Sequence, residues 1–278
     1  MNTLSVASIG VLAPGLAGWS ASRVVLAGEQ LYSAAPMPAA LATLLPANER
    51  RRTTATVKLA LQVAQEAMAN HPSLDKEAVA NHPSLSKEGK MQVYTVLASS
   101  GGDSEVLDKI CIALTQPDRP VSPTQFHHSV HNTPAGYWAI ATGCTLPSLS
   151  LSAHDGSFAA GLREAAALAW IEAAPVLLIA YDLPLPFPLS ERRRIAAPFA
   201  VALLLNPDVA GPRLATLRFN RDAAGYATSL ENSALETLRI GNPAARSLPL
   251  LCAIARQQAQ RVILPVGDHE SLSMEVEP

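Results

Sequence analysis

The segment 148–161 reads SLSLSAHDGSFAAG, and it constrains the fold more than any other part of the chain. Two leucines alternate with serines, which predicts a short, half-buried strand. Asp155 and Gly156 then form a turn, and small residues begin a helix. A strand, a sharp turn and a helix form an elbow that lifts a nucleophile above a sheet and points helix N–H groups at it. Here the turn carries Ala153, His154 and Asp155, so the elbow has no cysteine.

The rest of the chain alternates apolar runs with helical runs. Strand-like runs lie at 4–12, 92–98, 176–182, 199–207, 213–219, 261–266 and 271–277. Apolar residues at helical spacing lie between them, at about 48–70, 105–114, 133–143, 157–172 and 248–260. Strands and helices in alternation predict a layered α/β domain built around a mixed sheet.

Composition excludes several classes of partner. Hydrophobic residues make up 49% of the 278 residues and charged residues only 16%, so most of the chain must fold around a core. A net charge of −2 gives no electrostatic reason to expect nucleic acid as a partner. No apolar stretch approaches the roughly 20 residues of a membrane span, and the N-terminal run is typical of a strand rather than a signal peptide. Three scattered cysteines favour a reduced, cytoplasmic setting without disulfides.

Three histidines, His127, His128 and His131, lie within five residues. On a strand, the first and the last would share a face, where two imidazoles can bind zinc. No third ligand is obvious nearby. The favoured interpretation is therefore hydrogen bonding across a loop or an interface, and we expect neither a metal site nor a cofactor.

The elbow also contains the residue types of a catalytic triad, Ser152, His154 and Asp155. Residues this close on one turn cannot align a nucleophile, a base and an orienting acid, which normally come from separate elements. Cys144 precedes the elbow strand, away from any helix N-terminus that would activate a thiol, and is interpreted as a packing residue. The loop ASSGGD at 98–103 lacks the lysine of a phosphate-binding loop. These patterns do not predict a hydrolase.

Residues 69–90 contain a duplication, in which ANHPSLDKEAV is followed by ANHPSLSKEGK. Two copies are too few for a solenoid, which needs about three repeats to bury a core. Each copy has one histidine, His71 or His82, and a shared metal site is one interpretation. The polar composition and the proline in each copy favour a duplicated surface loop instead.

The run PTQFHHSVHNTPAGYWAIATGCTLPSLSLSAHDGSFAAGLREAAALA resembles the central segment of β-ketoacyl synthases of the thiolase-like fold. In that family an Asn-x-x-Ala-Gly helix and a glycine precede a strand, the catalytic cysteine elbow and a small-residue helix. Here these positions are Asn132, Ala135, Gly136 and Gly143. The resemblance covers residues 4–207. It implies a thiolase-like layered α/β (αβαβα-type) fold, with a complete N-terminal half over 1–207 and an abbreviated C-terminal half over 208–278.

The chain departs from this family where the chemistry would lie. The resemblance would place a cysteine where Ala153 or His154 stands, depending on a one-residue choice of alignment. The family's C-terminal half also supplies two histidines, whereas only His269 follows Asn206 here. Without a thiolate there is no acyl-enzyme. We therefore expect no catalytic residue in this chain and no condensation by it alone.

The resemblance implies a different role for an elbow without its nucleophile. Ketosynthases work as dimers, and chain-length factors are cysteine-less subunits that shape the acyl tunnel of an active β-ketoacyl-ACP synthase. The chain is similar to such partner subunits of aryl polyene pathways, which would meet an acyl carrier protein only indirectly. We expect the strand 148–152 to be an edge strand that pairs with the partner. The interface and tunnel would be formed by Ser148, Leu149, Ser150, Leu151, Ser152, His128, His131, Asn132, Tyr137, Trp138 and Phe158, beside the degenerate elbow Ala153, His154, Asp155 and Gly156.

Two other classes of function remain open at this point. One is a residual malonyl decarboxylase or acyl transferase that uses His154 or His128 as a base. The other is a freestanding acyl-binding or regulatory module. The triple arginine at 192–194 is interpreted as a solvated corner, with docking of an acidic acyl carrier protein as the alternative.

Overall fold

The computed structural model describes residues 3–71, 91–220 and 225–278. The duplicated segment, apart from residues 69–71, therefore lies outside the described residues, and so does His82.

One mixed sheet of nine strands organises the described part of the chain, and its strand order is β4-β3-β5-β6-β1-β7-β9-β8, with β2 paired to β1. Strands β4, β3 and β5 run parallel to one another, while the remaining neighbours are antiparallel. The strands are β1 (Thr3–Ala13), β2 (Leu16–Ala17), β3 (Tyr94–Ala98), β4 (Ser148–Leu151), β5 (Val176–Asp182), β6 (Phe199–Asn206), β7 (Ala215–Asn220), β8 (Gln260–Pro265) and β9 (Ser271–Glu277).

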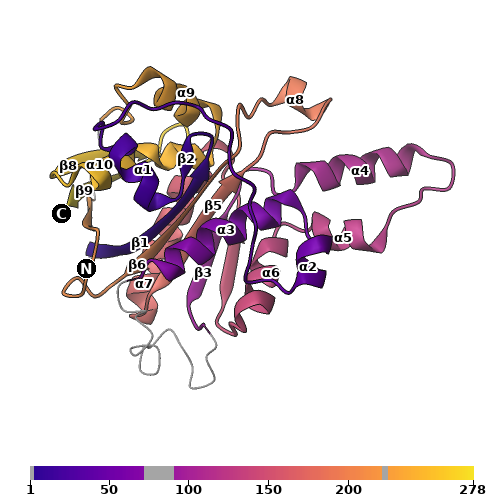
Figure 1. Ribbon diagram of the computed structural model, residues 1–278, viewed down its shortest axis with the longest axis horizontal. Helices are drawn as coiled ribbons and strands as arrows, with labels where there is room; N and C mark the ends of the chain where they lie inside the picture. Colours follow the sequence, from indigo (N-terminus) through magenta and orange to yellow (C-terminus); the bar gives the residue numbers. More distant parts are fainter. Residues whose placement is uncertain (1–2, 72–90, 221–224) are drawn as a thin grey trace.

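Helices cover both faces of this sheet (Figure 1). They are α1 (Trp19–Leu26), α2 (Ala47–Arg52), α3 (Ala55–Ala69), α4 (Ser104–Thr115), α5 (Pro123–Ser129), α6 (Thr133–Thr142), α7 (Ser157–Glu172), α8 (Leu189–Arg192), α9 (Ser233–Gly241) and α10 (Leu248–Arg256). None of the helices in these described segments is long and apolar enough to cross a membrane.

The two faces of β5 show why its sequence is continuously apolar. Leu178 and Ala180 belong to a core cluster that includes side chains of α7, α10 and α1. Leu177 and Ile179 belong to a second cluster formed with α3 and α6. A strand buried on both faces has no polar side to present. The layered α/β architecture predicted from the sequence is therefore confirmed.

Two predicted elements are different in the structure. The single helix expected over about 48–70 is divided into α2 and α3, because Thr53 is extended and the Thr54 Oγ1 accepts a hydrogen bond from Val57 N as the N-cap of α3. The run around His127 is a helix, α5, and not a strand. Pro123 occupies the first turn of this helix, where a missing N–H has no cost.

The last part of the chain continues the same sheet. Strand β7 pairs with β1, and β9 and β8 follow it at the far end from β4. Helix α10 packs against β8 and β9. The division at residue 207 into an N-terminal domain and a reduced C-terminal segment stays a prediction.

Candidate functional site at the elbow and the sheet edge

The elbow connects the edge strand β4 to helix α7 through one short helical turn, η2 (His154–Gly156). His154 has a φ of 51°, in the left-handed region that residues other than glycine seldom adopt. In an elbow, the residue on the strained turn is the one that presents the reactive side chain. The backbone therefore places His154, rather than Ala153, where an active elbow would carry its nucleophile.

Local contacts hold this turn in place. The hydroxyl of Ser157 accepts a hydrogen bond from Ala153 N at 3.0 Å and donates one to His154 O at 2.7 Å. Gly156 packs against the backbone after β8, where an added Cβ would lie 1.9 Å from Val266 O. Only glycine fits at this position, because the atom that would clash is backbone.

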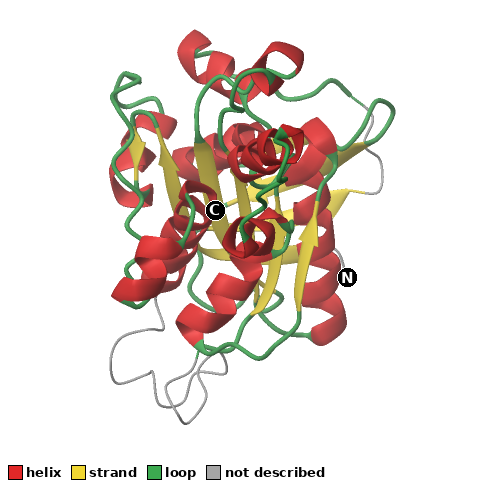
Figure 2. Ribbon diagram, turned by 90° about the vertical axis from the view of Figure 1, so that its right-hand side faces the viewer, coloured by secondary structure: helices red, strands yellow, loops and turns green. Residues whose placement is uncertain are grey.

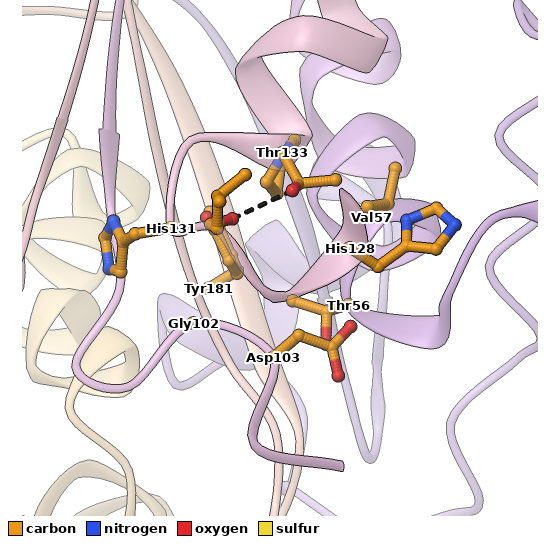
Figure 3. A pocket seen from close by; sticks show the side chains of 10 residues that line it. Thr56, Val57, Gly102, Asp103, His128, His131, Thr133 and Tyr181 are labelled. Carbon is orange, nitrogen blue, oxygen red and sulfur yellow. Dashed lines mark hydrogen bonds between the residues drawn. The ribbon is translucent and has the colours of Figure 1, made fainter. Parts of the chain in front are cut away.

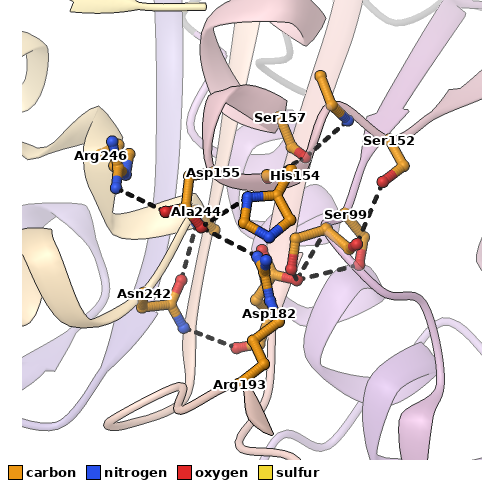
Figure 4. A network of polar contacts seen from close by, with 12 residues as sticks. Ser99, Ser152, His154, Asp155, Ser157, Asp182, Arg193, Asn242, Ala244 and Arg246 are labelled. Atoms are coloured by element: carbon orange, nitrogen blue, oxygen red, sulfur yellow. Dashed lines mark hydrogen bonds and ion pairs between the residues drawn. The ribbon is translucent and has the colours of Figure 1, made fainter. Parts of the chain in front are cut away.

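Asp155 does not orient His154 as a triad acid would. Its Oδ1 and Oδ2 accept hydrogen bonds from Arg193 Nη2 at 3.0 Å and Arg246 Nη2 at 2.9 Å, whereas His154 Nδ1 lies 3.5 Å from Oδ1 (Figure 4). Ser152 Oγ donates to Ser100 O at 3.1 Å, away from the imidazole. Ser152, His154 and Asp155 are therefore not aligned for nucleophilic catalysis. A pocket of about 430 Å³ lies between the elbow and the residues that follow β8.

Asp182, at the end of β5, is a buried carboxyl group that the sequence analysis did not single out. Its Oδ1 accepts hydrogen bonds from Ser100 Oγ at 2.7 Å, Ser100 N at 2.9 Å and Ser99 Oγ at 3.2 Å. Burial raises the pKa of Asp182 to about 6, against the lowering effect of these donors. The signal in the sequence was an acidic residue ending an otherwise apolar strand, at the carboxyl edge of a parallel sheet where sites form.

The three histidines have separate structural contacts. His128 is buried and stacks on Tyr137 with ring centroids 5.7 Å apart, and burial lowers the pKa of His128. His131 Nε2 lies 3.2 Å from Ser99 O. Figure 3 shows His128 and His131 on opposite sides of a small enclosed pocket. Across the described ranges, no three His, Cys, Asp or Glu side chains gather to hold a metal ion.

Three of the residues expected at the interface or tunnel are buried within the chain itself, and their part in an interface or tunnel stays a prediction. Tyr137 and Trp138 are 5% and 1% exposed, because they lie on the side of α6 that packs against α3 and the sheet. Phe158 is 0% exposed and lies in the core beneath α7. Asn132 precedes α6 but its side chain makes no capping hydrogen bond.

The edge position expected for the strand 148–152 is confirmed. β4 ends the strand order and pairs only with β3 among the described strands, and α6 packs beside it. Thr95 N donates to Pro147 O and Ser99 N donates to Leu151 O. Because the backbone groups of successive strand residues point to opposite sides, those of Ser148 and Ser150 point away from β3.

Exposed apolar side chains continue from this edge over α4, α5 and α6. Helix α4 packs along α5, and both project from the body on the right of Figure 1; Figure 2 views the molecule from that side. We name this region the edge surface. Its apolar members are Leu107, Ile112, Leu114, Phe126, Val130, Ile140 and Leu149, each 42–63% exposed. Scattered exposed leucines are ordinary, but seven exposed apolar side chains on or next to three neighbouring helices and the adjoining edge strand make this region a candidate for an interaction site.

The three cysteines lie away from the elbow turn. Cys144 is buried, and its Sγ donates to Val93 O at 3.3 Å. Cys252 is buried in α10, where burial raises the pKa of its thiol to about 11. Cys111 is exposed on α4. None of them presents a thiol at η2.

The strand order, the elbow and the layered helices define the class of protein. A family model described as the N-terminal domain of β-ketoacyl synthase matches residues 73–262. The chain belongs to the β-ketoacyl synthase family, and its fold is thiolase-like, as the sequence predicted. A comparison with curated proteins found no match.

Solved structures share this fold over the whole chain. One is the ketosynthase (ApeO) in complex with its chain length factor (ApeC) from Xenorhabdus doucetiae, with 23% identity, a TM-score of 0.69 and complete coverage of both chains. The ishigamide ketosynthase/chain length factor matches with 13% identity, a TM-score of 0.68 and 99% coverage of each chain. The complex AntDE:AntF, a type II acyl carrier protein with its ketosynthase, matches with 12% identity and a TM-score of 0.70, over 99% of this chain and 98% of that chain.

Proposed function

We propose that this chain is a non-catalytic subunit of the chain-length-factor type, which pairs with an active β-ketoacyl-ACP synthase and shapes its acyl tunnel. The observation that carries the proposal is the combination of an elbow without a thiol and an unpaired strand edge at that elbow. A subunit that has lost its nucleophile retains the elbow because the strand leading into it is the interface. Fold alone does not give this function, and its support is the elbow without a thiol together with the unpaired edge of β4.

The exposed side chains support a partner of this kind. Leu149, beside Ser150 in the sequence, is 44% exposed on β4, and Ile140 is 60% exposed on α6, the helix that packs beside this strand. An unpaired edge flanked by apolar side chains pairs readily with another strand. Interfaces of obligate partners bury well over about 2,000 Å², so the isolated chain is expected to associate with itself or to be poorly soluble.

The pathway is part of the proposal and is supported by the printed descriptions of two structural relatives. One relative is a ketosynthase with its chain length factor, and another contains an acyl carrier protein. We assign this chain to aryl polyene or related polyketide and fatty-acid-like synthesis in the cytoplasm. The carrier protein would be met through the active partner. Of the three arginines at 192–194, Arg193 turns inward to Asp155, which leaves exposed Arg192 and Arg194 as the candidates for direct docking.

The test is co-expression of the chain with β-ketoacyl-ACP synthases encoded beside its gene, followed by sizing and by turnover with malonyl carrier protein. The proposal expects a stable heterodimer, with product formation that requires both subunits. If the chain neither binds these synthases nor changes their products, the proposal fails. A matched control is the same synthase mixed with the chain carrying Ser150→Pro.

A second candidate function is a residual malonyl decarboxylase with His154 as the base. It is favoured by the 75% exposure of this side chain at the turn, beside a pocket of about 430 Å³. His128 is a poor alternative, because it is buried and burial lowers its pKa. Release of carbon dioxide from malonyl carrier protein by the isolated chain, lost in His154→Ala, would support this function over the first.

A further inference from the structure

Two arginines from distant parts of the chain converge on the elbow. Arg193 follows α8 in the connection from β5 to β6, and Arg246 lies in the short helical turn η3 (Ala244–Ser247). They bind different oxygens of Asp155, at 3.0 and 2.9 Å (Figure 4). Their side chains are only 24% and 23% exposed, so water screens these ion pairs less than those on an open surface.

The position of Arg246 is fixed independently of Asp155. The fully buried Asn242 precedes η3, and its Oδ1 accepts hydrogen bonds from Ala244 N at 2.8 Å and Ala245 N at 3.2 Å. Its Nδ2 donates to Asp182 O at 3.0 Å and to Ala197 O at 2.8 Å. These bonds tie η3 to the ends of the central strands. The backbone from which Arg246 extends is therefore held beside the elbow by contacts that do not involve Asp155.

Arg193 and Arg246 supply donors for an anion at the turn, and Asp268 is the other acidic residue beside Asp155 that lines the elbow pocket. Two guanidinium groups face one carboxylate, and Arg246 Nε is buried with no hydrogen-bond partner among the described residues. A buried donor without a partner indicates room for a further acceptor. Arg246 also lines the elbow pocket together with His154 and Val266.

We propose that this elbow is a carboxylate-binding site that is occupied by the chain's own Asp155. The two arginines recognise a small carboxylate, and Asp155 supplies it from within the turn. The bound carboxylate ties η2, the β5–β6 connection and η3 together. It also maintains the left-handed backbone of His154, a conformation that persists only when its surroundings impose it.

The consequence for the interface rests on the proposed function. Strand β4 runs directly into η2, so a turn held by two ion pairs also fixes the end of the strand that would meet the partner. Asp155 is in this sense a positioning residue. It does not touch the acyl group.

Chemical rescue tests the site without any partner. Asp155→Ala should lower the melting temperature of the chain by several degrees, because two half-buried arginines lose their counter-ion. Sodium acetate should then raise the melting temperature of this variant more than sodium chloride of equal ionic strength does, because acetate refills the site. Wild type should show no such difference, and the double variant Asp155→Ala with Arg246→Gln should lose the rescue.

Glu277→Ala provides the matched control. This exposed carboxylate accepts a hydrogen bond from one arginine, Arg218, on β7. Acetate should not rescue it specifically. If acetate and chloride act alike on Asp155→Ala, the proposal is overturned. Should that variant fail to fold, Asp155→Asn retains the shape of the side chain without its charge, and wild-type stability for Asp155→Asn would also overturn it.

The two proposals fail separately. Affinity for the ketosynthase is measured on wild type and on Asp155→Asn, with Asp155→Glu as the conservative variant that should recover part of the binding. If wild type binds no ketosynthase but acetate rescues Asp155→Ala, the proposed function is wrong and the carboxylate site stands. If wild type binds a ketosynthase but acetate does not rescue Asp155→Ala, the carboxylate site is wrong and the proposed function stands.

Discussion

Leu149 of β4 lies opposite Val96 of β3 in a parallel register, and on the other side of Leu149 the described part of the chain places no strand. This relationship gives β4 one used edge and one free edge. Thr95 N donates to Pro147 O and Ser99 N donates to Leu151 O, so the backbone groups of these odd-numbered residues face β3. The backbone N–H and C=O of Ser150 belong to the free edge.

Ser150→Pro should therefore separate partner binding from folding. Proline removes the N–H that points outward and leaves the ladder with β3 intact, a position that an edge strand tolerates. We expect an unchanged circular dichroism spectrum, a small shift in melting temperature and loss of the heterodimer on sizing. Ser150→Val, which retains the N–H, is the matched control and should still bind. A complex that survives Ser150→Pro would show that this strand is not the interface.

Charge on the edge surface should weaken the same complex. Ile140→Asp changes a side chain that is 60% exposed on α6, so folding should tolerate it, whereas an interface would bury the carboxylate. We expect at least a tenfold loss in affinity for the ketosynthase, as at other central interface positions. Ile171→Asp on α7, where the side chain is 79% exposed, is the control outside this surface and should bind normally. Equal affinities for the two variants would contradict an interface at α6.

Phe158→Ala tests whether Phe158 serves the core of this chain or the acyl tunnel. Because Phe158 is fully buried in the core, its truncation should destabilise the fold by about 3–5 kcal/mol. Unfolding in denaturant measures this directly. A stable variant whose heterodimer makes a product of different length would instead indicate that Phe158 lines the acyl tunnel.

The sequence predicted those parts of the site that depend on local pattern. Alternating leucines and a turn before small residues were enough to place β4 and the elbow, because period and turn chemistry act over a few residues. The choice between Ala153 and His154 needed the backbone angle of the turn. The sequence did not show that Tyr137 and Trp138 are buried, because α6 is apolar around most of its circumference and only its packing shows which side faces the core. Which side of a uniformly apolar helix is buried depends on tertiary packing and not on its local sequence.

The ion pairs of Asp155 were beyond sequence analysis for a different reason. Arg193 and Arg246 lie 38 and 91 residues away along the chain, and no local period connects them to the turn. Of the triple arginine, only Arg193 pairs with Asp155: Arg192 ends helix α8, and Arg193 follows it in an extended conformation. The three consecutive arginines were visible in the sequence, but the carboxylate that Arg193 binds was not.

A cysteine placed at the turn should show which residue is the elbow position. In a Cys111→Ser background, His154→Cys should react with iodoacetamide faster than Ala153→Cys does. The first thiol is exposed beside the N-terminus of α7 and two arginines, which favour the thiolate. Labelling rates measured by mass spectrometry on the folded chain provide the comparison, with buried Cys144 as an internal slow standard. Faster labelling of Ala153→Cys would move the elbow position by one residue.

Asp182 should make stability depend on pH in a direction opposite to that of a salt-bridged acid. Burial raises its pKa from 3.8 to about 6, so the folded state favours the protonated carboxyl. This contribution is fully present below about pH 4 and is lost as the pH rises through about 6. At about 1.4 kcal/mol per unit of pKa, the loss amounts to about 3 kcal/mol.

Asp182→Asn should remove this dependence, because the amide retains an acceptor for Ser99 and Ser100 and does not ionise. The free energy of unfolding is measured in denaturant near pH 4 and near pH 7 for wild type and variant. The advantage of Asp182→Asn over wild type should be about 3 kcal/mol larger at the higher pH. Asp118→Asn, a change of an exposed carboxylate after α4, gives the background effect. If the wild-type and Asp182→Asn values differ by the same amount at both pH values, burial does not raise the pKa of Asp182 in the folded chain, and the prediction fails.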